Sequence, residues 1–177
     1  MTTWISLLRG INVGGKNILP MKDLRALLEG VGFEKVQTYI QSGNCVFEAT
    51  GTEAGAISDA VAEAIEGRFG FRPAVLTLSA DDFARAVEAN PFANAADDPK
   101  SVHFFFLAEP ASGADIDGLD ALRAENERTG LTESVFYLHA PDGIGRSKLA
   151  AGAEKKLGVA VTARNLRSVL KLVDLAS

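Results

Sequence analysis

The residues best suited to chemistry are cations and amides near the two ends of the chain. Arginine binds phosphate and carboxylate groups through a planar fork of N–H donors, and lysine adds a point charge. Backbone N–H groups in glycine-rich turns and at helix N-termini are further donors to an anion. These residues predict a binding site for a small anionic ligand, with the candidate set Arg9, Asn12, Gly14, Gly15, Lys16, Gln41, Asn44, Arg146, Ser147, Lys148, Arg164 and Asn165.

The first part of this set lies in a glycine-rich connection, residues 8–17 (LRGINVGGKN). Glycine adopts positive φ without steric cost and lets a ligand approach the backbone. The spacing matches neither Gly-x-x-x-x-Gly-Lys-Ser/Thr nor Gly-x-Gly-x-x-Gly, the patterns with a known phosphate geometry. A mobile glycine loop without a ligand is therefore an equal alternative.

Candidates for catalysis are few. His139 is the histidine best placed to act as a general base near neutral pH, whereas His103 lies inside an apolar strand and is expected to be a structural histidine with satisfied hydrogen bonds. These histidines and Cys45 lack metal-ligand spacing, so no metal site is predicted. Ser147 is expected to cap a helix, and Cys45 to be a small core residue. The sequence identifies no catalytic residue and no cofactor, and leaves open whether the chain is an enzyme.

The net charge of −5 is unevenly distributed. Residues 1–50 carry five Lys or Arg and four Asp or Glu, residues 51–140 carry six and sixteen, and residues 141–177 carry seven and three. An acidic protein is poorly suited to non-specific binding of nucleic acid. The acidic middle is expected to be solvated helix surface, whereas a local basic site built from the two ends remains consistent with the charges.

The length of 177 residues accommodates one domain or two small ones. No apolar stretch approaches the roughly 20 residues of a membrane helix, and the N-terminus lacks a signal-peptide pattern. One cysteine excludes an internal disulfide and fits a reducing compartment. We therefore expect a cytoplasmic protein outside the membrane. The oligomeric state is not indicated.

Hydrophobic periodicity predicts the elements that position the first part of the set. A strand over residues 3–9 precedes the glycine-rich connection, and a helix follows from Pro20 to about Gly32. Strands over 36–41 and 44–48 form a hairpin, Thr52 and Glu53 open a helix that runs to Phe69, and a strand covers 72–78. The order strand, helix, strand, strand, helix, strand is typical of a ferredoxin-like unit.

The second half is predicted to contain a connecting helix over 80–90, a strand over 102–107, a short helix over 116–122, a strand region over 131–140, a helix after Ser147, a strand over 159–163 and a last helix capped by Asn165. The buried line of that last helix is expected to be Leu166, Val169, Leu170 and Val173. The polar loop 92–100 suggests the division into subdomains 1–100 and 101–177. RNA-binding sheets have a Lys or Arg and a glycine before their aromatic residues. Phe104, Phe105 and Phe106 lack this preceding pattern, so we expect them in the core.

Four motifs in order carry a resemblance to a known family: residues 9–16 (RGINVGGK), 39–44 (YIQSGN), 141–149 (PDGIGRSKL) and 162–165 (TARN). The chain resembles the bacterial domain of unknown function 1697 family over essentially its whole length. The resemblance implies an α+β fold of two tandem subdomains, each distantly ferredoxin-like, with mainly antiparallel sheets. It brings no established activity or catalytic residue. The family has Trp and then Thr after Arg-Asn, but this chain has Leu166 and Ser168, so a stacking role at that Trp position is not expected.

The leading functional hypothesis is a small anionic ligand, such as a nucleotide, a phosphate ester or a nucleic-acid end, bound where the glycine-rich loop and the basic C-terminal motifs meet. The alternative is a protein-interaction module with no small-molecule site. An RNA-binding role ranks third, and an enzyme with His139 as its base remains a further option.

Overall fold

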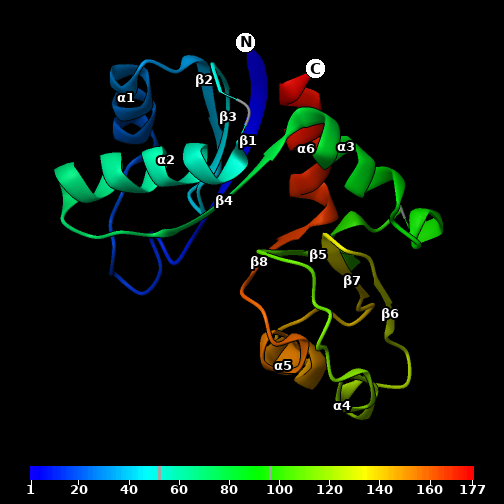
Figure 1. The fold of residues 1–177 in the computed structure, drawn as a ribbon. Coiled ribbons are helices and arrows are strands. Elements are labelled where there is room, and N and C mark those ends of the chain that lie inside the picture. Colours follow the sequence, from blue (N-terminus) through cyan, green and yellow to red (C-terminus); the bar gives the residue numbers. More distant parts are fainter. Residues whose placement is uncertain (52, 96) are drawn as a thin grey trace. The chain divides into compact units, whose positions relative to one another are not determined.

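The computed structural model describes residues 1–51, 53–95 and 97–177 and divides the chain into two compact units. The first unit comprises Met1–Arg85 and Leu170–Ser177, and the second comprises Ala86–Val169. The described residues form six α-helices and two four-stranded antiparallel sheets (Figure 1). The predicted α+β class with two subdomains is therefore confirmed. The division into subdomains 1–100 and 101–177 stays a prediction.

The first unit has the predicted ferredoxin-like order of elements. These are β1 (Thr2–Arg9), α1 (Met21–Val31), β2 (Glu34–Tyr39), β3 (Asn44–Ala49), α2 (Ala54–Phe69) and β4 (Ala74–Ser79). The sheet runs β2-β3-β1-β4, and each neighbouring pair is antiparallel. Figure 1 shows α1 and α2 on the same face of this sheet. Thr52, expected to open the second helix, lies outside the described residues.

The spacing of apolar residues explains both helices of the first unit. Leu24 and Leu28 of α1 are fully buried, and Ile57, Val61 and Ile65 of α2 recur at every fourth position on its buried side. Both helices end in a glycine with left-handed backbone, where a residue without a Cβ avoids strain. The helices therefore begin and end close to where the sequence predicts.

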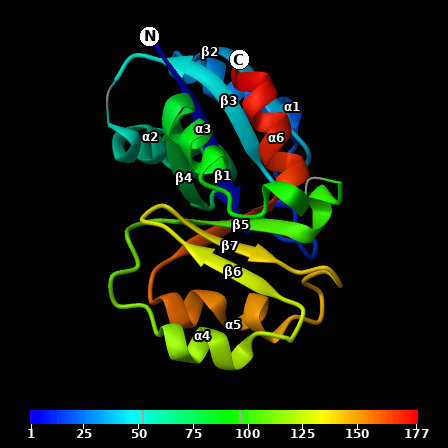
Figure 2. The same cartoon turned by 90° about the vertical axis from the view of Figure 1, so that its right-hand side faces the viewer.

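The second unit repeats the same order and the same sheet topology. Its elements are β5 (Val102–Leu107), α4 (Ile116–Leu122), β6 (Arg128–Leu131), β7 (Val135–His139), α5 (Lys148–Leu157) and β8 (Val161–Asn165). The sheet runs β6-β7-β5-β8 with antiparallel neighbours, and Figure 2 shows α4 and α5 on one face of it. Helices α3 (Ala80–Glu88) and α6 (Leu166–Ala176) follow β4 and β8, and the division between units falls within each of them.

The three phenylalanines of β5 are buried, as predicted. Phe105 packs with Leu119, Leu138 and Leu149 in the core beneath α4 and α5. Phe104 makes an edge contact with the Tyr137 ring, with centroids 4.8 Å apart. Because all three rings are inside, this strand does not present the exposed aromatics on which RNA-binding sheets stack bases.

The predicted strand region 131–140 contains β7, but the sequence analysis did not predict β6. A turn separates the two strands and is closed by the Val135 N–H, which donates to Thr132 Oγ1 at 3.1 Å. In α6, Leu170 is 45% exposed and Leu172 is fully buried, so the buried line of this helix differs from the predicted one. Among the described residues, no helix is both long enough and apolar enough to cross a membrane.

Candidate functional site

The glycine-rich connection of the first unit is a small β-hairpin. The Asn12 N–H donates to the Asn17 carbonyl, and the Lys16 N–H donates to the Val13 carbonyl, both at 3.1 Å. Gly14 and Gly15 form its two-residue turn with φ of 60° and 72°. Two successive residues with positive φ make a type I′ turn, which matches the twist of a hairpin. The connection is thus hydrogen-bonded rather than irregular.

Side-chain amides attach this hairpin to its surroundings. Asn12 Nδ2 donates to the carbonyls of Leu19 and Gln41, each at 2.9 Å, and its Oδ1 accepts the Leu19 N–H at 2.8 Å. Asn17 Nδ2 donates to the Gly10 carbonyl at 3.0 Å. Both amide hydrogens of Asn12 are therefore used within the fold, which gives this residue a structural role.

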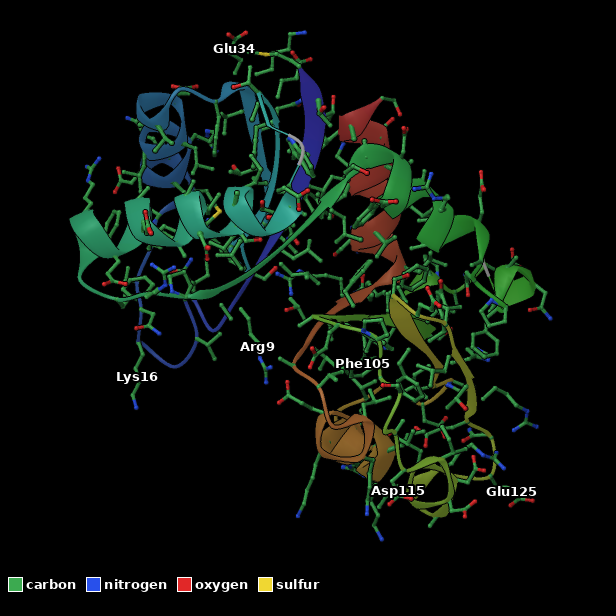
Figure 3. The ribbon with its side chains drawn as sticks, viewed as in Figure 1. Arg9, Lys16, Glu34, Phe105, Asp115 and Glu125 are labelled. Atoms are coloured by element: carbon green, nitrogen blue, oxygen red, sulfur yellow. The ribbon has the colours of Figure 1, made fainter. Side chains whose placement is uncertain are left out.

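Asn44 has a structural role of the same kind. It is fully buried, and its Nδ2 donates to the Tyr39 carbonyl at 2.8 Å and to Ser42 Oγ at 3.2 Å. By contrast, Arg9 and Lys16 are exposed, and Figure 3 shows both at the end of the first unit opposite Glu34. Gln41 is exposed as well, so Arg9, Lys16 and Gln41 are the side chains of the first part of the predicted set that are presented to solvent.

In the second unit, Ser147 caps α5, as predicted. Its Oγ accepts the Ala150 N–H at 3.0 Å, and its hydroxyl donates to Glu127 Oε2 at 2.6 Å. The first amides of a helix have no acceptor within it, so the exposed Lys148 begins α5 with an N–H group suited to an anion. Arg146 and Lys148 are exposed on either side of Ser147.

Sequence reasoning missed Glu127. This carboxylate is only 4% exposed, and its Oε1 accepts the Ala124 N–H at 2.8 Å while Oε2 accepts the Ser147 hydroxyl. Its main-chain carbonyl accepts Nη1 of Arg123 at 2.8 Å and of Arg128 at 2.9 Å. Glu127 belongs to the acidic middle that was expected to be solvated, and no local pattern distinguishes it, because its partner Ser147 lies 20 residues away.

Glu127 and Ser147 lie in the wall of a cleft with a volume of about 640 Å³. A hydrogen bond at 2.8 Å from Asn126 Nδ2 to Asp142 Oδ2 joins its two sides. The loop before α5 completes the lining, which consists of Ala124, Asn126, Glu127, Asp142, Gly143, Gly145, Arg146 and Ser147. The cleft thus combines a cation, backbone groups and a helix N-terminus with two carboxylates.

Arg164 and Asn165 are not part of this lining. Asn165 Oδ1 accepts the Ser168 N–H at 3.0 Å, so the predicted cap of the last helix is confirmed. Arg164 pairs with Phe104 in the β5–β8 register, and its Nη1 donates to the Ala163 carbonyl at 2.9 Å. The prediction that the basic motifs of both units share one ligand stays a prediction.

The two histidines have different surroundings. His139 is half-buried, lies across from Arg128 in the β6–β7 register, and has its ring 5.6 Å from that of Phe92 in a second cleft of about 490 Å³. His103 is 7% exposed, and its Nε2 has no hydrogen-bond partner among the described residues. The prediction that His103 is buried is confirmed, but the prediction that its hydrogen bonds are satisfied is wrong, because Nε2 lacks a partner in the described part of the chain. Burial lowers the pKa of His103, opposed by a hydrogen bond to the Lys100 backbone.

A metal centre does not emerge from the described part of the chain, where no three His, Cys, Asp or Glu residues gather closely enough to hold an ion. Cys45 is buried, as predicted.

The fold defines a class of α+β protein in which two ferredoxin-like units follow one another. Residues 1–137 match the model of the family described as protein of unknown function, DUF1697, and the chain belongs to this family. It is similar in structure to the conserved bacterial protein SP0830 from Streptococcus pneumoniae, with 27% identity over 99% of each chain and a TM-score of 0.71. No curated protein matches the chain. The family description names no activity, so a function has to be argued from the site.

Proposed function

We propose that the protein binds a small anionic ligand, such as a phosphate ester or a nucleotide, in the cleft at the N-terminus of α5. The observation that carries the proposal is the coincidence of that helix N-terminus with Arg146 in a cleft of about 640 Å³. Small-molecule sites commonly enclose about 300–1,000 Å³. The glycines of the loop, Gly143 and Gly145, leave its backbone accessible to a ligand.

The strength of the donors supports an anion over a neutral ligand. A helix N-terminus carries roughly half a positive charge, and a hydrogen bond to a charged group contributes about 1.5–3 kcal/mol. The carboxylate of Glu127 opposes an anion, but it already accepts the Ala124 N–H and the Ser147 hydroxyl. Arg146 and the α5 amides are therefore the groups that we assign to the negative charge.

The proposal keeps the charged and glycine residues of the first unit as additional candidates. Arg9, Gly14, Gly15 and Lys16 form or flank the hairpin turn, whereas Asn12 and Asn44 hold the loops in place. We place the protein in the cytoplasm, in keeping with its single buried cysteine. The glycine turn and its cations contribute to anion binding only if the ligand contacts them. The substitution Lys16→Ala tests this contact separately.

Thermal-shift measurements with inorganic phosphate and with ADP test the proposal. A ligand at about 100 times its Kd stabilises the folded protein by roughly 2.7 kcal/mol. Arg146→Ala should abolish most of this shift, whereas Arg167→Ala, which removes an exposed arginine of α6, should leave it unchanged. If Lys16→Ala also reduces the shift, the glycine hairpin contributes to the same binding event. The absence of any shift with either probe would reject the proposal and favour an interaction module.

A glycine substitution tests the cleft without removing a charge. A Cβ on Gly145 would meet no heavy atom within 4 Å, so Gly145→Ala should fold normally and yet obstruct a ligand that contacts this backbone. Gly30→Ala in α1 is the matched control, since a Cβ there also meets open space. Equal phosphate affinity in both variants would argue against a ligand at this loop.

A further inference from the structure

The cleft contains hydrogen-bond acceptors that a bare anion cannot use. Glu127 and Asp142 both line it, and an ionised carboxylate offers about four lone-pair sites. Hydrogen bonds within the protein occupy one site on each oxygen of Glu127 and one on Oδ2 of Asp142. Inorganic phosphate is mainly an acceptor at neutral pH, so it gains little from these groups and is repelled by their charge.

The Asn126–Asp142 pair presents both kinds of group side by side. Asn126 uses an N–H to reach Asp142 Oδ2 at 2.8 Å, which leaves its other N–H and its carbonyl oxygen for a further partner. A hydroxyl donates one hydrogen bond and accepts up to two, so it can donate to Asp142 and accept from Asn126. An acidic side chain binding a ribose hydroxyl is the arrangement that dinucleotide-binding folds use.

The charged groups of the cleft loop are also separated along the chain, with positive groups at its α5 end and a carboxylate at the other. The cation Arg146 and the first amides of α5 lie at the helix N-terminus, while Asp142 begins the loop four residues earlier and is tied to Asn126. A water molecule occupies about 30 Å³ in the liquid, so a cleft of about 640 Å³ is much larger than a single phosphate ion requires. A ligand with an anionic end and a hydroxylated body would use both kinds of lining.

We propose that the ligand of this cleft is a phosphorylated polyol of the sugar-phosphate class, with its phosphate at Arg146 and the α5 N-terminus and its hydroxyls at Asp142 and Asn126. This inference rests on the proposed function, since it requires the anion to bind at Arg146. Asp142 then determines selectivity for the hydroxylated body of the ligand. This residue is exposed and is not part of the core.

Calorimetric titration of the intact protein with inorganic phosphate, ribose 5-phosphate and free ribose tests the inference. Ribose 5-phosphate should bind at least tenfold more tightly than phosphate, which corresponds to about 1.4 kcal/mol. Asp142→Asn should reduce that preference below threefold, while Asp120→Asn, an exposed substitution in α4, should not alter it.

The possible results separate the two proposals. Equal affinities for phosphate and ribose 5-phosphate, or a preference that survives Asp142→Asn, would overturn the sugar-phosphate assignment and leave anion binding intact. If neither anion binds, both proposals fail together. Binding of free ribose as tight as that of ribose 5-phosphate would show that hydroxyls alone determine affinity, which contradicts the role assigned to Arg146.

Discussion

At the scale of single residues, the side chains of the cleft are held by bonds that cross long stretches of chain. Ser147 was predictable as a cap because serine before a helix is a local pattern. The burial of Glu127 was not predictable from local sequence. Its carboxylate accepts hydrogen bonds from the Ala124 N–H, three residues earlier, and from the Ser147 hydroxyl, which follows β7 in the chain. Asn12 and Asn44 were placed in the ligand-binding set by type, yet their amides bind backbone carbonyls that only the folded loops bring close.

Replacing Ser147 by alanine should destabilise the protein by about 2–4 kcal/mol. Loss of a serine cap costs roughly 1 kcal/mol, and loss of a hydrogen bond to a buried carboxylate costs about 1.5–3 kcal/mol. Urea unfolding measures this free energy. Ser147→Thr keeps the hydroxyl and should remain close to the wild type. A loss below about 0.5 kcal/mol, as at an ordinary surface site, would show that the Ser147–Glu127 bond does not stabilise the loop.

His103 should make stability depend on pH. Burial holds the pKa of His103 below its ordinary value of 6.5, so the unfolded chain takes up a proton as pH falls through 6.5 before the folded protein does. Stability therefore decreases as pH falls below about 6.5, since the unfolded state binds more protons there. Urea unfolding between pH 7.5 and 5.5 should give a flatter profile for His103→Leu than for the wild type. Parallel profiles would contradict this, because His139 is common to both proteins.

At the scale of elements, the sequence predicts long periodic segments well and short irregular ones poorly. Helices α1 and α2 show apolar residues at helical spacing, and β5 is a continuous apolar run, so all three were predicted nearly to their ends. Strand β6 has the sequence RTGL, with neither alternation nor a run of apolar residues, and was missed. Its pairing with β7 and the closeness of Gly130 to Pro91 are tertiary properties.

The turn between β2 and β3 should tolerate substitution poorly. A Cβ on Gly43 would lie 2.7 Å from Ile11 Cδ1 and 2.8 Å from Leu8 Cβ, and its φ is +92°. Left-handed backbone costs a residue with a Cβ about 1–2 kcal/mol, and overpacking costs about 1–3 kcal/mol. Gly43→Ala should therefore lower the free energy of unfolding by about 2–5 kcal/mol, whereas Gly30→Ala in α1 should raise it by about 0.5–1 kcal/mol. A neutral effect at Gly43 would contradict the close packing of Ile11 against this turn.

At the scale of the whole molecule, two units with the same topology differ in what they expose. The first presents Arg9 and Lys16 beside a hydrogen-bonded hairpin, and the second presents a cleft at the start of α5. The charge asymmetry of the sequence predicted that cations near the two ends would matter. It did not predict that the cleft would lie wholly within the second unit, because that depends on how the 124–127 and 142–147 segments fold against each other.

A nitrogen-15 correlation NMR titration of the intact protein with inorganic phosphate tests the central claim most directly. Backbone amides report contact with an anion at each residue, and the account predicts saturable shifts that are largest at the exposed residues Gly145 and Lys148. The same titration of Arg146→Ala should show these shifts greatly reduced. Saturable shifts that avoid these two amides, or shifts that grow linearly with phosphate and never saturate, would contradict a binding site at the N-terminus of α5.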